Sequence, residues 1–259
     1  QCIAIIDSIK AYAQQNPTEA QVYEDWFQAV VNLRDALSQD KRFDAYKYSG
    51  ELRSVCAAMI GKMKTGEDVA KVYDIIGRTY LFEAKDVFDS YCIYLEWNRA
   101  PEKKFYQPRR KVLRTVANAL QDLADDRLDL LAISMPPGCG KTALAIFYLT
   151  WLAGRSPDEP MLTGSHSNSF VRGVYDECLR IFDKDGEYLW NDVFPDVTVS
   201  NTNAKDCRID LGKRKRFETL EFTSIGTGNA GLYRASTLLY CDDLVSGIEV
   251  ALSKPRLDK

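Results

Sequence analysis

The sequence contains no long apolar run. No stretch of it approaches the roughly 20 consecutive apolar residues that a membrane-spanning helix requires. The N-terminal segment QCIAIIDSIKAY has no basic flank and carries Asp7 early, so it does not predict a secretory signal peptide. The 259 residues are 46% apolar and 27% charged, as in an ordinary globular protein. We therefore expect a protein outside the membrane, with one large domain or two unequal ones.

The chain also lacks paired cysteines and an excess of positive charge. Its seven cysteines are odd in number and widely spaced, and no CxxC pair occurs, so neither a disulfide framework nor a zinc site is indicated. This cysteine usage favours a reducing cytoplasm. The formal net charge of −3 argues against a surface coated uniformly with positive charge. It does not exclude local basic clusters, because a partner responds mainly to the nearby field.

The hydrophobic pattern changes near Pro101. Residues 1–100 carry apolar side chains at helical spacing, notably over 21–37 and over a long segment from about 67 to 97, and predict an all-helical N-terminal region. In residues 101–259 short apolar runs alternate with helical stretches, which is typical of βαβ units. The second region therefore predicts an α/β domain with a mostly parallel sheet flanked by helices.

The second region can be divided into individual elements. Predicted strands cover residues 128–134, 160–166, 207–211, 216–225 and 236–243, and predicted helices cover 142–154 and 167–182.

A phosphate-binding loop is expected between the first predicted strand and the first predicted helix. The segment reads Pro137, Gly138, Cys139, Gly140, Lys141 and Thr142. Glycines let consecutive backbone N–H groups turn inward toward anionic oxygens, and the helix N-terminus adds partial positive charge. Lys141 then reaches the β- and γ-phosphates of ATP, and the Thr142 hydroxyl binds Mg²⁺. The match to the usual pattern is imperfect, since Met135 replaces its first glycine.

A P-loop NTPase also needs a carboxylate on another strand for its magnesium ion. The run STLLYCDD, residues 236–243, is an apolar strand that ends in two acids. Asp242 is the expected metal ligand. Asp243, next to the γ-phosphate, is expected to orient or deprotonate the attacking water.

The single histidine and two basic clusters leave alternatives open. His166 follows the second predicted strand, at the edge where parallel sheets bind ligands, and either contacts the γ-phosphate or DNA or simply ends the strand with local hydrogen bonds. The basic clusters at residues 103–111 and 213–216 either contact phosphates of DNA or are solvated. For 213–216, between two predicted strands, a solvated hairpin tip is favoured.

Three stretches carry a resemblance to a known family. MPPGCGKT after a strand, LLYCDDLVSGIEVALSKPRLDK, and EWNRAPEKKFYQPRRKVL upstream resemble the ATPase portion of bacteriophage terminase large subunits. The resemblance covers roughly residues 90–259 well and the N-terminal helices loosely. The double proline in the loop is fairly specific to this family.

The resemblance implies an ATP-driven motor that moves double-stranded DNA into a preformed capsid in the host cell cytoplasm. It implies ATP and Mg²⁺ as ligands, and a portal protein, a small terminase subunit and a homo-oligomeric ring as partners. Lys141 and Thr142 would bind phosphate and Mg²⁺, Asp242 would be the Walker B acid, and Asp243 the catalytic carboxylate. Gln107 would be the candidate for adenine contact, or else a solvated polar residue.

The chain departs from the family pattern in two places. Many terminases carry an arginine inside the loop where this chain has Gly138, so charge neutralisation must come from elsewhere. Arg234 is the candidate for a finger that reaches a neighbouring subunit's nucleotide, or else a surface arginine that pairs locally. The family's coupling motif, lid and nuclease lie beyond the Walker B strand, so we expect no nuclease activity from residues 1–259.

Two other functions are compatible with the motifs. One is a helicase-like, nucleic-acid-stimulated P-loop ATPase, although the arginine motifs of a second core domain are missing. The other is a non-catalytic module that binds nucleotide or partner proteins. Nucleotide binding without hydrolysis would separate this module from the two enzymes.

Overall fold

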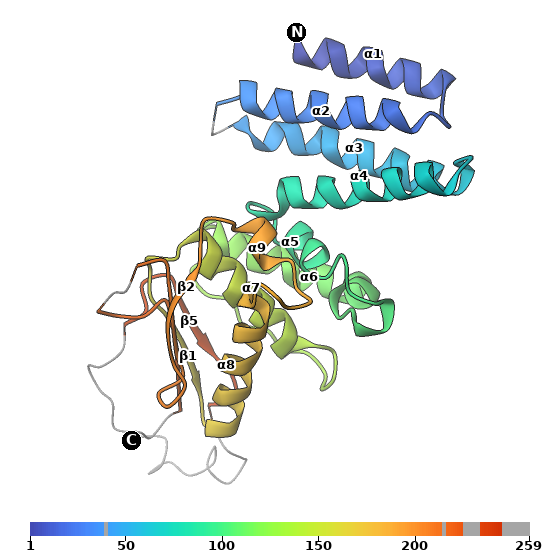
Figure 1. Cartoon of the computed structure of the whole chain (residues 1–259). Helices are drawn as coiled ribbons and strands as arrows, with labels where there is room; N and C mark the ends of the chain where they lie inside the picture. The colour runs from blue at the N-terminus through green and yellow to red at the C-terminus, as the bar shows by residue number, and fades with distance from the viewer. Residues whose placement is uncertain (39–40, 214–215, 225–233, 245–259) are drawn as a thin grey trace. The chain divides into compact units, whose positions relative to one another are not determined.

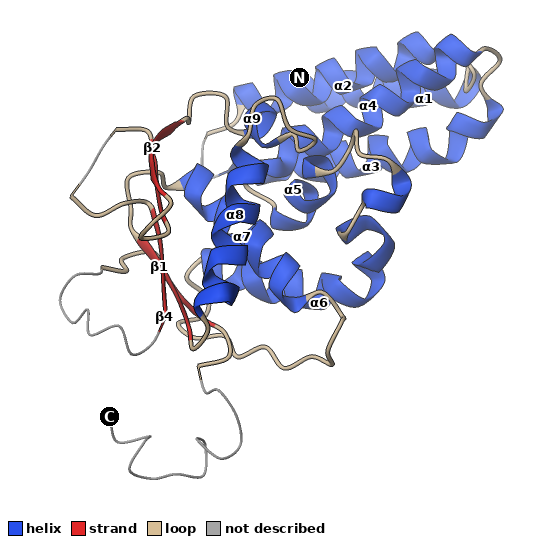
Figure 2. Ribbon diagram, turned by 60° about the horizontal axis from the view of Figure 1, so that its bottom comes forward, coloured by secondary structure: helices blue, strands red, loops and turns tan. Residues whose placement is uncertain are grey.

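The computed structural model describes residues 1–38, 41–213, 216–224 and 234–244. The chain has an α/β fold with a helical first part and a mixed sheet (Figures 1 and 2). It divides into two compact units, Gln1–Tyr94 and Leu95–Lys259. Within the described part of the chain, no helix is both long enough and apolar enough to cross a membrane.

The first unit is built from four long helices in sequence. They are α1 (Cys2–Gln15), α2 (Ala20–Ala36), α3 (Phe43–Met59) and α4 (Gly66–Ala84), with a 3₁₀ turn η2 (Ile60–Lys62) after α3. Helix α2 packs against α1, α3 and α4, and the four helices lie side by side in Figure 1. Their shared core comes from the apolar stripe of α2, which includes Tyr23, Trp26 and Val30.

The long helical segment expected over residues 67–97 is two helices. Helix α4 ends at Ala84, and α5 (Phe88–Leu95) begins after a short turn. Asp86 in that turn accepts a hydrogen bond from the Tyr46 hydroxyl at 2.5 Å and pairs with Arg42. These tertiary contacts hold the turn, and residue spacing alone does not reveal them.

The second unit contains the sheet and the remaining helices. The helices are η3 (Pro101–Lys103), α6 (Tyr106–Ala124), α7 (Lys141–Arg155), α8 (Asn168–Phe182) and α9 (Trp190–Val193). The strands are β1 (Met161–Ser165), β2 (Val199–Asn203), β3 (Arg208–Leu211), β4 (Leu220–Ser224) and β5 (Leu238–Cys241). The expected helices at 142–154 and 167–182 are confirmed as α7 and α8.

The sheet has the strand order β2-β3-β4-β1-β5. Strand β1 is parallel to β4 and β5, whereas β3 is antiparallel to both β2 and β4. The expectation of a mostly parallel sheet is therefore wrong, because β2, β3 and β4 follow one another without the long crossover that parallel neighbours require. Helix α8 packs on β1 and β4, and α7 lies beside α8 on the same side of the sheet (Figures 1 and 2).

The expected strand at residues 128–134 is also not formed. The backbone of this segment forms no β-strand, and Leu130 is 84% exposed. Along 131–135, half-buried and exposed residues alternate, as in an extended segment covered on one face. It is not a strand because no strand in the described part of the sheet pairs with it: β5 lines the same groove as residues 128–131, and β5 pairs only with β1 there.

Candidate functional site

The loop that precedes α7 turns at two glycines. Gly138 and Gly140 have φ values of 79° and 95°, in the left-handed region that glycine adopts without strain. The Leu144 amide donates to the Gly140 carbonyl at 3.0 Å, so α7 begins immediately after the loop. The N–H groups of a helix's first turn have no partner within the helix and carry partial positive charge. The loop therefore opens onto the part of α7 best suited to bind an anion.

Helix α7 is held firmly because it is buried on nearly every side. Ten of its residues, from Leu144 to Gly154, are buried. Trp190 donates its indole N–H to the Thr150 carbonyl at 3.0 Å, which fixes α9 against the middle of α7. A helix anchored in this way places its first residues, Lys141 and Thr142, accurately.

Asp242 lies opposite the start of α7, directly after β5. Lys141 donates from Nζ to Asp242 Oδ1 at 2.5 Å, and the Thr142 hydroxyl donates to Oδ2 at 3.4 Å. The Tyr240 hydroxyl also donates to Oδ2, at 2.8 Å. Asp242 is 5% exposed, so its charge depends on these donors. Two residues expected from the loop motif therefore meet the carboxylate expected from the distant strand motif.

The protonation states of this cluster follow from its contacts. The hydrogen bond to Asp242 raises the pKa of Lys141, against a smaller lowering by burial, so the lysine stays a cation. Burial, strengthened by the bond to Asp242, raises the pKa of Tyr240, so the phenol stays a neutral donor. The Asp242 side chain is consequently met by one ammonium and two hydroxyl donors.

Asp243 and His166 lie next to each other beyond the ends of β5 and β1. The Asp243 carbonyl accepts from the His166 backbone N–H at 3.0 Å and from His166 Nδ1. Asp243 has a φ of 47°, unusual for a residue other than glycine. Its side chain is exposed. His166 thus joins the end of β1 to the residue after Asp242, and its contact with the γ-phosphate or DNA stays a prediction.

Phe105 is a site residue that the sequence analysis did not single out. It directly precedes α6, and its ring lies against the loop so closely that a Cβ added to Gly140 would meet Phe105 Cε2 at 2.4 Å. The ring also packs edge to face on Phe147 of α7, with centroids 5.5 Å apart. The only signal in the sequence was its position beside Gln107 in the FYQPRR stretch. Tyr240 was likewise missed, because its hydroxyl donates to Asp242 only in the folded sheet.

The other predicted site residues lie in the loop, on α6 and before β5. Pro137 is exposed and Cys139 half-buried, both within the loop. Gln107 is exposed in the first turn of α6, two residues after Phe105. Arg234 is exposed and precedes β5, whereas Asp242 follows its end, so the structure does not bring Arg234 to this chain's own site.

A groove of about 880 Å³ adjoins the cluster. Residues 128–131, α6, α7 and β5 line it, and Lys141 and Asp242 are among the lining residues. One of its walls is the edge of β5, where Leu239 is 60% exposed. The groove therefore lies between the extended segment before the loop and the last described strand.

The oxygen donors suit magnesium. Thr142 and Asp242 offer a hydroxyl and a carboxylate within 3.4 Å of each other. Mg²⁺ usually takes one or two carboxylates and completes its shell with water and substrate phosphates, so a small donor set fits. Among the described residues no group of three or more His, Cys, Asp or Glu side chains could hold a metal ion.

Comparisons with protein-family models, with curated proteins and with solved structures found no match.

Proposed function

We propose that this chain is the ATP-hydrolysing motor domain of a phage terminase large subunit, with a P-loop NTPase fold. The observation that carries the proposal is the meeting of Lys141 and Thr142 with Asp242, about a hundred residues along the chain. A phosphate loop at a helix N-terminus, joined to a carboxylate that ends a neighbouring strand, is the constellation that phosphoryl transfer from ATP requires.

The residues divide the chemistry between them. Lys141 neutralises charge on the β- and γ-phosphates once it leaves Asp242, and Thr142 and Asp242 hold Mg²⁺. When bound, Mg²⁺ supplies charge neutralisation at the phosphate oxygens. Asp243 orients the attacking water with its exposed carboxylate, while its contact with His166 fixes the backbone from which that carboxylate extends. Transfer of the γ-phosphoryl group to water then proceeds in line.

The partners follow from the same proposal. They are double-stranded DNA, a portal protein, a small terminase subunit and further copies of this chain in a ring. In the ring, Arg234 reaches the nucleotide of a neighbouring subunit. If the Arg234→Ala variant keeps its turnover per assembled ring, the role of Arg234 is refuted and the rest of the proposal stands.

The test is Mg²⁺-dependent ATP hydrolysis with and without double-stranded DNA. Lys141→Ala and Asp243→Ala should each abolish turnover, and Lys141→Ala should also abolish ATP binding. Lys205→Ala and Asp196→Ala remove the same charges at exposed positions and serve as matched controls. If the Lys141→Ala variant still hydrolyses ATP, hydrolysis does not depend on this loop and the proposal is refuted.

One observation favours a second candidate, a non-catalytic nucleotide-binding module. Residues 128–134 are unpaired within the described sheet, so the loop lacks the rigid strand that normally precedes it. The assay above separates the candidates: ATP binding through Lys141 without hydrolysis supports the module. Turnover stimulated equally by single-stranded and double-stranded nucleic acid would instead indicate a helicase-like ATPase.

A further inference from the structure

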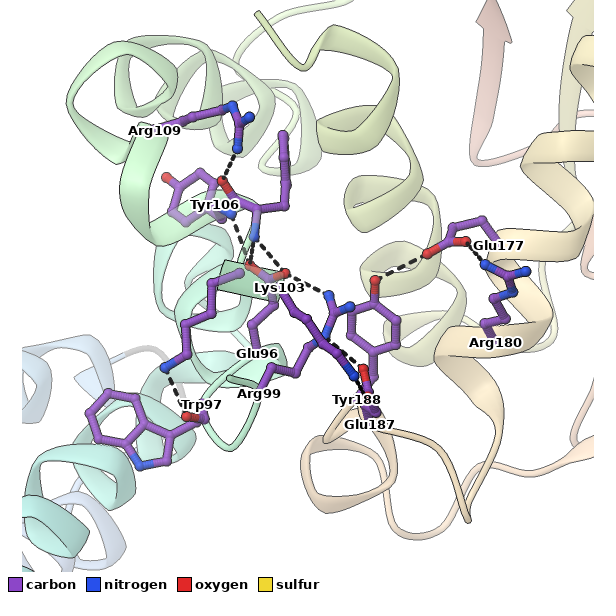
Figure 3. Close-up of polar contacts among 12 residues, drawn as sticks. Glu96, Trp97, Arg99, Lys103, Tyr106, Arg109, Glu177, Arg180, Glu187 and Tyr188 are labelled. Carbon is purple, nitrogen blue, oxygen red and sulfur yellow. Dashed lines mark hydrogen bonds and ion pairs between the residues drawn. The ribbon is translucent and has the colours of Figure 1, made fainter. Parts of the chain in front are cut away.

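Glu96 is a buried carboxylate that none of the motifs explains. It is 1% exposed. Its oxygens accept hydrogen bonds from the Phe105 backbone N–H at 2.8 and 3.0 Å, from the Tyr106 N–H at 2.8 Å and from Arg99 at 2.9 Å (Figure 3). Two of these donors are the backbone groups at the start of α6.

Helix α6 needs such an acceptor. The first N–H groups of a helix have no partner within it, and a capping side chain or another acceptor must satisfy them. Phe105, the residue before the helix, supplies no side-chain cap. The Glu96 carboxylate takes that place, and its negative charge is favourable at the positive end of the helix. The start of α6 is therefore fixed by a residue that lies before η3 in the chain.

The charge of Glu96 is balanced by an ordered cation. Arg99, whose side chain is 14% exposed, bonds Glu96, lies 3.5 Å from a carboxylate oxygen of Glu187 and stacks over the Tyr188 ring at 4.3 Å. Lys103 also pairs with Glu187 (Figure 3). Both carboxylate oxygens of Glu96 are thus hydrogen-bonded, to the two backbone N–H groups and to Arg99, and these bonds keep the carboxylate in place.

The network ends at the phosphate loop. The backbone of Phe105, which Glu96 fixes, carries the ring that lies against Gly140 and packs on Phe147. Arg109 adds to this arrangement by donating to the Phe105 carbonyl at 3.2 Å. A continuous set of contacts thus joins the Glu96 carboxylate to the residue directly before Lys141.

We propose that Glu96 is a positioning residue for the phosphate loop, acting through the Phe105 ring on the conformation of Gly140. Loss of the carboxylate frees the start of α6, lets the ring move and loosens the loop. The expected change in ATP affinity rests on the proposed function, whereas the expected change in the loop backbone does not.

The test compares Glu96→Gln with Phe105→Leu, the double variant, and Glu102→Gln as a control that neutralises an exposed glutamate of η3. Amide hydrogen exchange is measured first, without nucleotide. Glu96→Gln should speed exchange about tenfold at the amides of Phe105 and Tyr106, since their bonds to a charged acceptor are lost. Exchange at the Gly140 amide should rise by a similar factor, since the ring that covers this residue is no longer held. Unchanged exchange at Gly140 in both single variants overturns the proposal. If Glu96→Gln does not fold, Phe105→Leu decides by the same criterion.

ATP affinity in the presence of Mg²⁺ is measured next. Each single variant should bind ATP about tenfold more weakly, and the double variant should be no weaker than Phe105→Leu, because both act through one ring. Additive losses, or a loss in Phe105→Leu alone, overturn the proposal. If the unaltered chain binds no ATP, the proposed function fails, and the exchange at Gly140 still decides the role of Glu96.

Discussion

The ion pair between Lys141 and Asp242 makes a specific prediction about nucleotide binding without metal. Phosphates that enter the loop must take Lys141 from a carboxylate 2.5 Å away, and they approach that carboxylate's negative charge. Asp242→Asn removes both obstacles while keeping the side chain's shape. The variant should therefore bind ATP more tightly than the unaltered chain when Mg²⁺ is absent, and more weakly when Mg²⁺ is present, because a metal ligand is lost.

The size of the effect follows from the geometry. A hydrogen bond between charged groups contributes about 1.5–3 kcal/mol. The Lys141 side chain is 35% exposed, so solvent screening reduces this value. About 1–2 kcal/mol remains, which corresponds to roughly 5- to 30-fold in the dissociation constant.

The assay is titration calorimetry with ATP in EDTA and again in Mg²⁺. Asp243→Asn is the matched control, because it removes a neighbouring charge that makes no hydrogen bond to Lys141; it should change metal-free affinity by a smaller factor. If the Asp242→Asn variant binds metal-free ATP no more tightly than the unaltered chain, the ion pair does not compete with phosphate. The reasoning would then be refuted.

Two further predictions concern stability. Gly140→Ala should lower the free energy of unfolding by roughly 2–3 kcal/mol, since it combines a left-handed backbone with a clash against Phe105, whereas Gly138→Ala, with nothing within 4 Å, should cost only about 1 kcal/mol. Equal costs in urea denaturation would contradict the packing of the ring. Burial, with a contribution from Glu218, raises the pKa of Glu221 from 4.5 to about 7, so the unfolded chain loses this proton first as pH rises. The free energy of unfolding should fall by up to about 3 kcal/mol between pH 4.5 and 7, and Glu221→Gln should remove that part of the slope. If the Glu221→Gln variant keeps the same dependence of unfolding free energy on pH, other groups cause that dependence.

The local features of the fold were readable from the sequence. Helices α7 and α8 have strong apolar patterns and clear beginnings: glycines precede the first, and Ser167 caps the second by accepting from the Phe170 amide at 3.3 Å. Strand β1 is a short, mostly buried apolar run, and β5 is an apolar run in which half-buried and exposed residues alternate. The meeting of Lys141 and Asp242 was predicted from their motifs, because a phosphate loop needs a carboxylate on another strand for its magnesium ion.

Features that depend on distant partners were not readable. Residues 128–134 have the composition of a strand, but a strand also needs a neighbour, which composition does not reveal. Strand β2 was missed because its residues, VSNTN, are mostly exposed and lack apolar alternation. The contact of Phe105 with Gly140 arises only when α6 and α7 pack together, and the acceptor role of Glu96 arises only when the chain after α5 brings Glu96 to the start of α6. Arg234 as a finger, Gln107 as an adenine contact, and basic residues 214–215, which lie outside the described residues, remain predictions.

The position of His166 has a practical consequence for spectroscopy. It is the only histidine in the 259 residues, and its ring bonds the carbonyl of Asp243. The imidazole resonances of this protein therefore come from a single place, at the edge of the candidate site, without isotope labelling of selected residues. A change in the backbone of Asp243 would alter the hydrogen bond at Nδ1 and with it the chemical shifts of the ring. The chain thus carries a natural NMR probe that contacts the residue after Asp242.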